Sequence, residues 1–428
     1  MANKDYAPQS PLYQRIAAEI ASQIDTGRYK PGQRIPSIRH YAAIFGCNKL
    51  TVQKAFSLLK RRGIIENRVG SGSYVRYPEK LGSAGEVFDF KTDYLEVGFF
   101  PYRRVQEIYN ELFAGEKAQA LAPVEVKGDP GLIKTLSRLY HVPADRMIII
   151  SGAQQGLDLI AKIYSFRIAD TILFEDPTYP GAISLFKARH FVPFKSGGPS
   201  LEALDRKLGG KIRLFYTMPA VHNPTGRSYS RRTRDAVADR ARKYGFYIIE
   251  DDYLSEFADD SLPRFLDLVP ENTIYIKSLS QTTAAGLRLG FMVVPREIYD
   301  KILYAKFTSD IASNGLVQKF FARFISQGHY REHMAAMADK VACRKKRLTQ
   351  LIAEFDFLEC DSDRQRGYSL WVRAGRDMAV DNAPWRWGSD FSFDPKYRCY
   401  FRLSFMHLRD GHFRQALDYL RRLFKYLR

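Results

Sequence analysis

The 428-residue sequence has little cysteine and no long apolar run. Its four cysteines lie far apart and fit no metal-binding or redox spacing, so we exclude a disulfide-stapled module and expect free, buried thiols. No apolar stretch approaches the ~20 residues that a helix needs to span a bilayer, and the polar start Met1–Ser10 lacks the apolar segment of a signal peptide. We therefore expect a cytoplasmic protein with no membrane partner.

Low-complexity tracts and internal repeats are also missing, which excludes solenoids and propellers. Hydrophobic residues make up 45% and charged residues 26% of the chain, a composition typical of a globular protein and not of a disordered or fibrous one. At ~100–200 residues per domain, the length predicts two or three domains.

Acidic residues are few near the start of the chain. The whole sequence has 66 Lys and Arg against 47 Asp and Glu, a net charge of +19. Residues 1–80 contain 14 Lys and Arg but only 5 Asp and Glu, a net charge of +9, and this concentration is typical of a region that binds a polyanion such as nucleic acid. A run with Pro and Gly at residues 78–85 indicates a linker. We therefore divide the chain into a domain at 8–77, a linker at 78–87 and a larger domain at 88–428.

The residues before the linker show the pattern of a winged helix-turn-helix. Apolar residues recur at every fourth position in Leu12–Ile24, which predicts a first helix. Ser37 and Asn48 are placed to cap a second and a third helix, with a glycine-containing turn between the two helices. Two short strands are predicted at residues 64–67 and 73–75, joined by the glycine-rich tip of a wing.

In such a motif the start of the third helix presents polar side chains to base edges in the major groove, and the wing approaches phosphates or the minor groove. We interpret Lys60, Arg61 and Arg62 as a solvated helix face, because they point several ways around the helix. The residues expected to contact double-stranded DNA are Arg39, Asn48, Lys49, Thr51, Gln53, Lys54, Arg68, Gly70 and Gly72. The stretch from Ile35 to Val75 closely resembles the GntR-type winged helix of bacterial transcription regulators, and the resemblance covers residues 11–76.

After residue 88, short apolar runs alternate with helical patterns. Because buried runs separated by helices are typical of a parallel sheet, we expect an α/β domain with a mostly parallel sheet. Ligands of such sheets bind at the carboxyl ends of the strands. The predicted strands are Met147–Ile150, Thr171–Phe174, Arg213–Tyr216, Phe246–Ile249 and Ile274–Ile276.

The segments that follow these strands form a chemically coherent set. Ser151–Gln155 opens a predicted helix, whose first backbone amides suit a phosphate-sized anion. Glu175–Pro180 includes an aromatic ring, His222–Gly226 supplies an amide on a turn, and Glu250–Tyr253 supplies carboxylates and a phenol. Ser278–Gly290 adds hydroxyls and a guanidinium. Each segment alone has an ordinary explanation as a turn or a strand end, but in this order they predict a ligand site.

From Phe88 onward this set resembles the fold-type I aminotransferases, which use pyridoxal 5′-phosphate. Behind a GntR-type winged helix, the combination is similar to the MocR subfamily of regulators. The resemblance implies that pyridoxal or pyridoxamine phosphate is bound through its phosphate by Gly152, Ala153, Gln154, Ser278, Ser280 and Arg288. It further implies a stacking contact from Tyr179, bonds to the ring hydroxyl from Asn223 and Tyr253, a partner for the ring nitrogen in Asp251, and a carboxylate clamp in Arg402.

One residue departs from this family pattern in a way that bears on the chemistry. Family members carry a lysine directly after the Ser-x-Ser unit, where its amine forms the Schiff base with the cofactor and moves a proton; this sequence has Gln281 there. An amide neither forms an imine nor acts as a base near neutral pH. The nearest lysine, Lys277, is about 13 Å away along an extended strand. Lys127 also stands where the family usually has a tyrosine.

We therefore expect no ordinary transamination, which leaves three possibilities for the larger domain: a non-covalent pyridoxal or pyridoxamine phosphate, a different anionic effector, or an empty domain kept for dimerisation. We favour a bound ligand, because the positions implied for the phosphate, the ring and the carboxylate are all present. The resulting hypothesis is a homodimeric transcription regulator that senses a small molecule and reads an operator with two half-sites. The rivals are an active aminotransferase with an appended DNA-binding domain and a ligand-free dimerisation scaffold.

Overall fold

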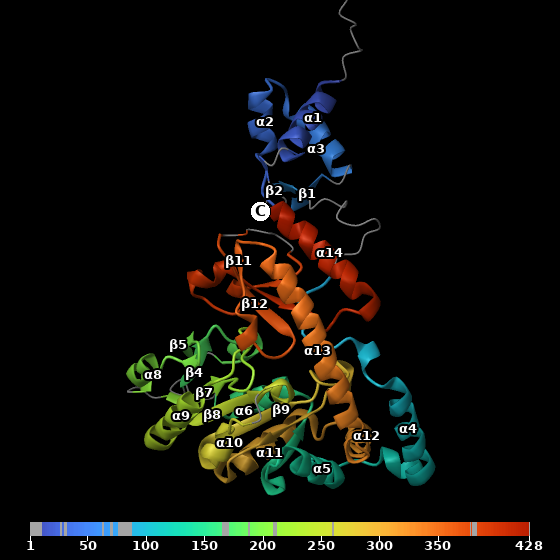
Figure 1. Ribbon diagram of the computed structural model, residues 1–428, viewed down its shortest axis with the longest axis vertical. Helices are drawn as coiled ribbons and strands as arrows, with labels where there is room; N and C mark the ends of the chain where they lie inside the picture. The colour runs from blue at the N-terminus through green and yellow to red at the C-terminus, as the bar shows by residue number, and fades with distance from the viewer. Residues whose placement is uncertain are drawn as a thin grey trace, which may run out of the picture. The chain divides into compact units, whose positions relative to one another are not determined.

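The computed structural model describes residues 11–25, 28–29, 32–61, 64–68, 72–75, 88–164, 171–186, 189–208, 212–258, 261–376, 378 and 383–427. They fall into two compact units (Figure 1). The N-terminal unit comprises Met1–Phe88 with Asp377–Pro384 and Asp418–Arg428, and the C-terminal unit comprises Asp89–Arg376 with Trp385–Leu417. The expected linker at residues 78–87 lies outside the described residues.

The N-terminal unit contains the helices and the hairpin that the sequence predicts. Ser37 caps the second helix by accepting a hydrogen bond from the His40 amide (3.3 Å), and Asn48 caps the third by accepting from the Thr51 amide (2.9 Å), so both predicted caps are confirmed. The elements are α1 (Leu12–Asp25), α2 (Ile38–Ile44), α3 (Lys49–Arg61) and the antiparallel strands β1 (Ile65–Arg68) and β2 (Gly72–Val75).

The core of this unit forms where the apolar stripe of α1 meets α3. Ile16 and Ile20 of α1 are fully buried together with Val52 and Leu59 of α3. Leu50 of α3 is apolar too, but its side chain is 67% exposed. It therefore points outward from the helix, unlike Val52 and Leu59.

The C-terminal unit is built on one large sheet, as the alternation of apolar runs predicts. Within the described residues the strand order is β3 (Met147–Ile150), β10 (Gly290–Val293), β9 (Thr273–Ser278), β8 (Tyr247–Asp252), β7 (Ile212–Thr217), β4 (Thr171–Asp176), β5 (Arg189–Lys195) and β6 (Gly198–Pro199). The run β9, β8, β7, β4, β5 is parallel, whereas β10 is antiparallel to both of its neighbours and β6 is antiparallel to β5. The α/β fold with a mostly parallel sheet is confirmed.

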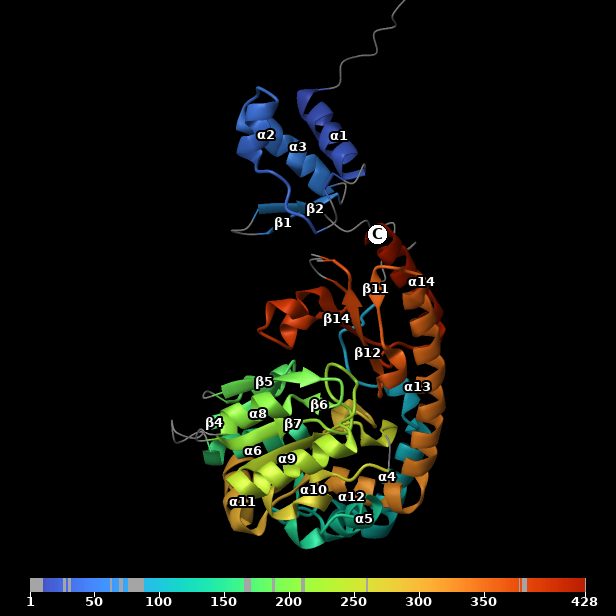
Figure 2. The same ribbon diagram turned by 60° about the vertical axis from the view of Figure 1, so that its left-hand side comes forward.

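Helices cover both faces of this sheet, as Figure 2 shows. They are α4 (Tyr102–Glu116), α5 (Pro130–Tyr140), α6 (Ala153–Tyr164), α7 (Pro180–Ile183), α8 (Leu201–Leu208), α9 (Arg231–Tyr244), α10 (Phe265–Leu268), α11 (Arg296–Asp310) and α12 (Gly315–Ser326). Because side chains alternate along a strand, Ile148 and Ile150 of β3 face α6 and α11, whereas Met147 and Ile149 face α5 and α12. The carboxyl ends of the parallel strands remain open for a ligand.

A second, antiparallel sheet was not expected from the sequence. Its strand order is β11 (Leu358–Glu359), β12 (Ser369–Ala374), β14 (Tyr400–Ser404) and β13 (Arg386–Trp387). Strands as short as β11 and β13 carry too little periodicity to be recognised. The long helix α13 (His329–Ala353) precedes this sheet, and α14 (Asp410–Leu427) follows it.

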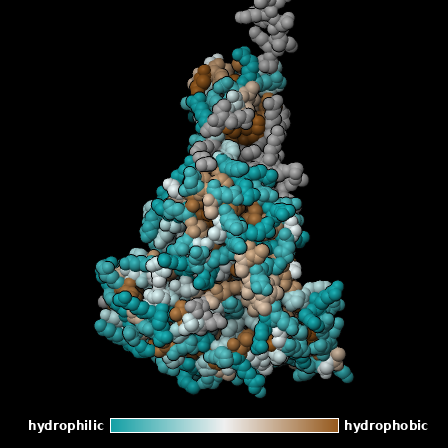
Figure 3. All heavy atoms as spheres, viewed as in Figure 1, coloured by the Kyte–Doolittle hydropathy of each residue, from teal (hydrophilic) through white to brown (hydrophobic). Residues whose placement is uncertain are grey.

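The surface of the C-terminal unit is mostly hydrophilic on the face drawn in Figure 3, with apolar residues in smaller groups between the polar ones. The cysteines are free, but the expectation that they are buried is wrong: Cys343 is exposed on the outer side of α13, and Cys47, Cys360 and Cys399 are only partly buried. Within the described ranges, no helix has the length and apolar character needed to cross a bilayer.

Candidate DNA-binding face and ligand pocket

The predicted DNA-reading residues of the helices lie on the surface of α2 and α3. Those that are exposed are Arg39, Asn48, Lys49, Gln53 and Lys54. Lys49 and Gln53 share one side of α3, because residues four apart face the same way, and the exposed Leu50 lies beside them with Lys54. Thr51 is half-buried, and its hydroxyl bonds Asn48 Oδ1 (3.0 Å). The capping role occupies this oxygen, so Asn48 keeps only its amide donors for another partner.

The wing is described only in part. Arg68 ends β1, but its side chain and the whole of Gly70 lie outside the described residues. Gly72 begins β2 at a φ of 122°, and a Cβ there would lie 2.8 Å from Nε of Arg34. Glycine is favoured at position 72 by its backbone conformation, and a larger residue would also displace the Arg34 side chain.

A cavity of about 660 Å³ lies in the C-terminal unit where β3, β4 and β9 end. Its described lining consists of Tyr94, Ala153, Gln154, Tyr179, Gly181, Ser278, Ser280, Gln281, Ala285, Gly286 and Arg288. The structure thus gathers in one place most of the residues implied for the phosphate, with the ring-stacking Tyr179 and with Gln281. The remaining predicted residues, Asn223, Asp251, Tyr253 and Arg402, lie beyond this lining.

Arg288 and the start of α6 form a cradle suited to a phosphate. Gly152 adopts a φ of 89°, and a Cβ there would lie 2.7 Å from Nη2 of Arg288. The guanidinium donates from Nη2 to the Ser151 carbonyl oxygen (3.1 Å) and from Nη1 to Ser280 Oγ (3.5 Å). It is therefore held against the amino end of α6, where unpaired backbone amides already favour an anion.

Tyr179 lies on the wall of the cavity with its ring against a glycine. A Cβ on Gly181 would lie 2.5 Å from the Tyr179 ring, so no other residue would let the ring occupy this place. The hydroxyl donates to Gln154 Oε1 (3.3 Å), and Gln154 Nε2 donates to the Gly181 carbonyl oxygen (3.3 Å). Burial and the nearby Asp251 carboxylate raise the pKa of Tyr179 to about 12, so the phenol stays neutral and can serve as a stacking surface.

Asp251 carries a carboxylate oxygen that has no protein partner. Its Oδ2 accepts a hydrogen bond from the Tyr216 hydroxyl (2.7 Å), whereas the buried Oδ1 has none among the described residues. Burial raises the pKa of Asp251 to about 6. A buried, unpartnered carboxylate oxygen is suited to a cationic ring N–H, so these residues fit a phosphorylated pyridine ligand.

The two acidic neighbours of Asp251 are engaged elsewhere. Glu250 Oε2 accepts from the Leu266 amide (3.0 Å), and Asp252 Oδ1 pairs with the amine of Lys277 (3.0 Å). The strand β8 extends to Asp252, so the alternation of side chains places Glu250 and Asp252 on the opposite face of the sheet from Asp251.

Arg402 meets Asn223, as expected of two residues in one site, but it also meets an unexpected carboxylate. Its Nη1 donates to Asn223 Oδ1 (2.7 Å), and its Nη2 pairs with Asp93 Oδ2 (2.5 Å). The Arg402 side chain is 4% exposed and that of Asp93 is 24% exposed. Asp93 follows no recognisable motif, so nothing in the local sequence pointed to it.

Gln281 lies on the cavity wall and bonds a tyrosine from a distant part of the chain. The Tyr368 hydroxyl donates to Gln281 Oε1 (2.6 Å) and also lies 3.1 Å from the Gln281 carbonyl oxygen. None of the described residues that line the cavity is a lysine. Within the described ranges, no cluster of three His, Cys, Asp or Glu residues could hold a metal ion.

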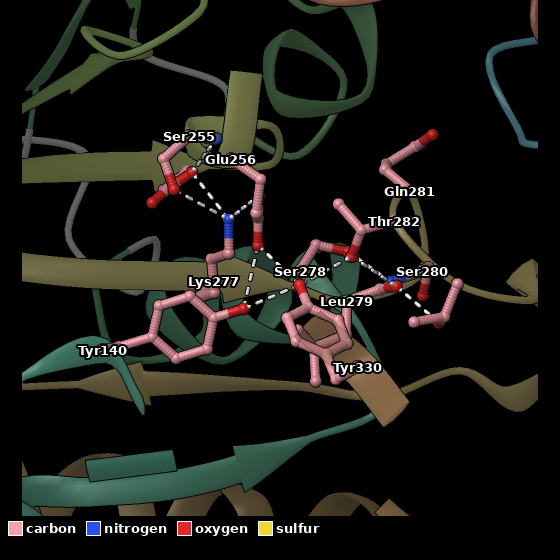
Figure 4. Close-up of polar contacts among 12 residues, drawn as sticks. Tyr140, Ser255, Glu256, Lys277, Ser278, Leu279, Ser280, Gln281, Thr282 and Tyr330 are labelled. Atoms are coloured by element: carbon pink, nitrogen blue, oxygen red, sulfur yellow. Dashed lines mark hydrogen bonds and ion pairs between the residues drawn. The ribbon is translucent and has the colours of Figure 1, made fainter. Parts of the chain in front are cut away.

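Lys277, the lysine nearest to Gln281 along the chain, points away from this cavity. Figure 4 shows its amine directed at Ser255 and Glu256, whereas Gln281 points away from that group. The amine lies 3.0 Å from Asp252 Oδ1, 3.0 Å from Ser255 Oγ and 2.7 Å from Glu256 Oε2. Burial alone would lower the pKa of Lys277, but Asp252 and Glu256 raise it above the ordinary value. A charged, fully paired amine on the opposite face of the sheet does not serve the cavity.

Sequence reasoning missed the tyrosines of the site and its second carboxylate. Tyr94 lines the cavity, Tyr216 holds Asp251, Tyr368 holds Gln281, and Asp93 pairs with Arg402. Tyr216 lies within a predicted strand, where alternation could have marked it as sharing a face with the ligand residues. The other three lie in segments that carry no motif.

Two family models match the chain. The model described as "Aminotransferase class I and II" matches residues 95–380, and the model described as "Bacterial regulatory proteins, gntR family" matches residues 12–75. Among similar proteins, the "Uncharacterized HTH-type transcriptional regulator YcxD" of Bacillus subtilis (strain 168) is 29% identical over 355 residues, which cover 79% of this chain and 80% of that protein. The "Probable rhizopine catabolism regulatory protein MocR" of Rhizobium meliloti is 25% identical over 437 residues, which cover 91% and 87%.

Solved structures show the same fold. The multiple substrate aminotransferase from Thermococcus profundus gives a TM-score of 0.72 at 22% identity and covers 81% of this chain and 93% of its own. The α-aminoadipate aminotransferase LysN from Thermus thermophilus, solved with N-(5′-phosphopyridoxyl)-L-leucine, gives a TM-score of 0.72 at 22% identity and covers 80% and 92%. The chain belongs to the aminotransferase class I and II family and carries a GntR-family helix-turn-helix domain ahead of that region.

Proposed function

We propose that this protein is a DNA-binding transcription regulator whose aminotransferase-like domain binds a small ligand and does not catalyse transamination. The observation that carries the proposal is the composition of the cavity: its described lining supplies an anion cradle and Gln281 but no lysine. The names of the relatives YcxD and MocR support a regulatory role. Such a regulator would act in the cytoplasm, where its operator is.

The ligand that we propose is pyridoxal or pyridoxamine 5′-phosphate held without a covalent bond. Gly152, Ala153 and Arg288 would hold the phosphate, Tyr179 would stack on the ring, and Asp251 would accept the ring N–H. Asn223 and Tyr253 would serve the ring hydroxyl. Bound pyridoxal phosphate would supply a reactive carbonyl, but Gln281 offers it only an amide, which donates and accepts hydrogen bonds and moves no proton near neutral pH. A different phosphorylated effector would use the same cradle.

Ligand binding is tested by the thermal stability of the purified protein with pyridoxamine phosphate and with pyridoxal phosphate. A specific ligand at 100 times its dissociation constant adds about 2.7 kcal/mol to the free energy of unfolding. We expect this stabilisation in the wild type and its loss in Arg288→Ala. The variant Arg296→Ala, which removes an exposed arginine paired with Asp145, serves as the matched control. Absence of stabilisation by either compound would favour the dimerisation scaffold.

The rival enzyme is tested by borohydride reduction in the presence of pyridoxal phosphate, followed by peptide mass spectrometry. We expect no lysine to gain the mass of the phosphopyridoxyl group beyond the level seen in denatured protein. Specific labelling of one lysine, together with transfer of an amino group from an added amino acid to a keto acid, would support the appended aminotransferase instead.

We propose that the exposed side of α3 reads the major groove and that the protein binds as a homodimer to two half-sites. Exposed apolar residues occur on α4 (Tyr102 and Phe113) and separately on α11 (Tyr304 and Phe307), and either helix could take part in self-association. Native mass spectrometry gives the oligomeric state, and selection from a random DNA pool gives the preferred sequence. We expect a dimer and a selected sequence with two related halves. A monomer that selects single half-sites would contradict this part of the proposal.

A further inference from the structure

A short segment at the start of the C-terminal unit runs beside the carboxylate clamp. We name residues 89–96 the strap. Its backbone is hydrogen-bonded to β14 and to the residues that follow β14. The Ser404 amide donates to the Phe90 carbonyl oxygen (2.9 Å), and the Glu96 amide donates to the Met406 carbonyl oxygen (2.9 Å). The strap also supplies Tyr94 to the wall of the cavity. It therefore joins the ligand pocket to the chain that leads back, through residues 76–87, to the winged helix.

The side chain of Asp93 fastens the strap to Arg402. The carboxylate pairs with Arg402 Nη2 at 2.5 Å, and its other oxygen accepts a hydrogen bond from the Ser404 hydroxyl. The Tyr368 hydroxyl lies 2.7 Å from the Asp93 carbonyl oxygen and 2.6 Å from Gln281 Oε1, and it can donate its one proton to either of them. Asp93 thus presents to Arg402 the same chemical group that an amino-acid ligand would present.

In its pairing with Asp93, Arg402 uses only one of the two nitrogens on the Nε/Nη2 edge of its guanidinium. Nη1 is held by Asn223, but the buried Nε has no hydrogen-bond partner among the described residues. Nε and Nη2 lie on the same edge of the guanidinium plane, the edge that a carboxylate can bridge with two parallel hydrogen bonds. Asp93 bonds only one of these two nitrogens, so an incoming carboxylate that bonds both would gain a contact that Asp93 does not make.

We propose that Asp93 is an internal carboxylate that occupies Arg402, and that a carboxylate-bearing ligand of the pocket displaces it and releases the strap. This inference rests on the proposed function, because the ligand is taken to bind in the cavity described above. Asp93 is 24% exposed, so its displaced carboxylate can return to water at small cost, whereas the 4% exposed Arg402 must keep a partner. In the sequence only Phe88 separates the strap from the linker at 78–87, so its release is a route along the chain from ligand binding to the DNA-binding domain.

Two probes that differ only in one carboxylate test the proposal. The first is N-(5′-phosphopyridoxyl)-L-leucine, and the second is the phosphopyridoxyl derivative of 3-methylbutylamine, which is leucine without its carboxylate. Affinities are measured by calorimetry for the wild type, for Asp93→Asn and for Asp205→Asn. Asp205 is the matched control, because it also pairs with an arginine, Arg240 (2.6 Å), and neither residue is among the described lining of the cavity.

We expect Asp93→Asn to bind the carboxylate probe about tenfold more tightly than the wild type, because the internal competitor is gone. The probe without the carboxylate should bind both proteins within about twofold of each other, and Asp205→Asn should match the wild type with both probes. Equal affinity of the carboxylate probe for the wild type and Asp93→Asn would overturn the proposal.

Hydrogen exchange of the wild-type protein gives a second readout that needs no variant to fold. The carboxylate probe should increase exchange in peptides that cover the strap, including the amide of Glu96, and the probe without the carboxylate should leave them unchanged. Unchanged or slower exchange of the strap with the carboxylate probe would overturn the release step. If the probe without the carboxylate binds but neither readout depends on the carboxylate, only this inference fails. If neither probe binds any of the three proteins, the proposed pocket fails with it.

Discussion

Two sets of positive charges, one in each unit, differ in how they are exposed. In the N-terminal unit, Arg39, Lys49 and Lys54 lie exposed on the outer sides of α2 and α3. In the C-terminal unit, Lys277 and Arg402 are buried, and each is matched by carboxylates, Asp252 and Glu256 in one case and Asp93 in the other. The C-terminal unit also has exposed cations, such as Lys134 and Lys301, but these two buried ones are fixed in place by their partners.

Exposed and buried cations suit different ligands. Exposed cations exchange their counterions for DNA phosphates with little desolvation, and the resulting affinity depends steeply on salt. Buried cations are already desolvated and oriented, so they discriminate by geometry, and salt screens them far less. We therefore expect DNA binding to weaken strongly with added salt. The contact of a ligand carboxylate with the buried Arg402 should depend less on salt than the contact of a ligand phosphate with the exposed Arg288. The following variants sharpen that contrast.

The largest expected effect is on stability, from Lys277→Met. Removing the amine leaves Asp252 and Glu256 buried without a cation, which costs about 3–5 kcal/mol in the free energy of unfolding. Lys54→Met, which removes an exposed lysine of α3, should change it by less than about 0.5 kcal/mol. Chemical denaturation measures both. A similar small loss in the two variants would mean that the buried pairing contributes nothing.

The deficit of Lys277→Met should also depend on pH. Although burial alone would raise the pKa of Asp252, Lys277 and other partners hold it below the ordinary value. A lowered pKa in the folded state gives stability that is present at neutral pH and is lost as the pH falls through that pKa. The difference between the wild type and Lys277→Met should therefore shrink in acid. The triple variant Lys277→Met, Asp252→Asn, Glu256→Gln should recover most of the loss at pH 7.

The next effect is on DNA. Lys49→Glu combined with Lys54→Glu should weaken binding to the selected operator by about 100-fold at moderate salt and reduce the slope of affinity against salt by about 2. The control Lys134→Glu combined with Lys301→Glu makes the same change in net charge on exposed positions of the C-terminal unit. Fluorescence anisotropy measures both. Equal losses in the two double variants would mean that net charge, and not the face of α3, decides binding.

A smaller effect is expected from the titration of Asp251. Its pKa in the unliganded protein is raised by burial to about 6, so below that pH the carboxyl is neutral and no longer attracts a protonated ring nitrogen. At pH 7, Asp251→Asn should bind pyridoxamine phosphate about tenfold more weakly than the wild type, and at pH 5 the two should bind alike. Taking the ratio of the two proteins cancels the titration of the ligand phosphate. If the ratio of the two affinities does not change with pH, Asp251 does not bind the ring nitrogen.

The smallest effect concerns Leu50, the exposed apolar residue among the polar ones of α3. We expect it to contact a thymine methyl group, so that Leu50→Ala weakens operator binding by about 1 kcal/mol, roughly fivefold. The free energy of unfolding of Leu50→Ala should differ from that of the wild type by less than about 0.5 kcal/mol, because the Leu50 side chain is 67% exposed. Ile44→Ala on α2, at 61% exposure, is the matched control and should not affect one base position selectively.

The local features of both units could be predicted from short stretches of sequence. Ser37 and Asn48 marked helix starts because a cap bonds the amide three residues along, a contact that needs no tertiary structure. The buried strands of the large sheet were recognised because each is a continuous apolar run between helices. The outward direction of Leu50 could not be predicted in this way, since one apolar residue of a helix can point outward without disturbing the helix.

The tertiary structure alone decided which polar groups meet. Arg402 reaches Asp93, Tyr368 reaches Gln281, and Tyr216 reaches Asp251, in each case across strands or segments whose distance along the chain carries no signal. The spacing of Lys277 and Gln281 along the strand predicts a distance too large for the lysine to replace the glutamine. In the fold, the sheet also turns the Lys277 amine to the opposite face, where it pairs with Asp252.

The order of residues was enough to identify a GntR-type winged helix, an aminotransferase-like α/β domain and a glutamine after the Ser-x-Ser unit. The contacts within the site became known only from the fold: Arg402 pairs with the carboxylate of Asp93, and Asp251 Oδ1 has no partner among the described residues. The physical reason is that hydrogen bonds and ion pairs act over about 3 Å, so they depend on how the elements pack and not on where residues stand in the chain.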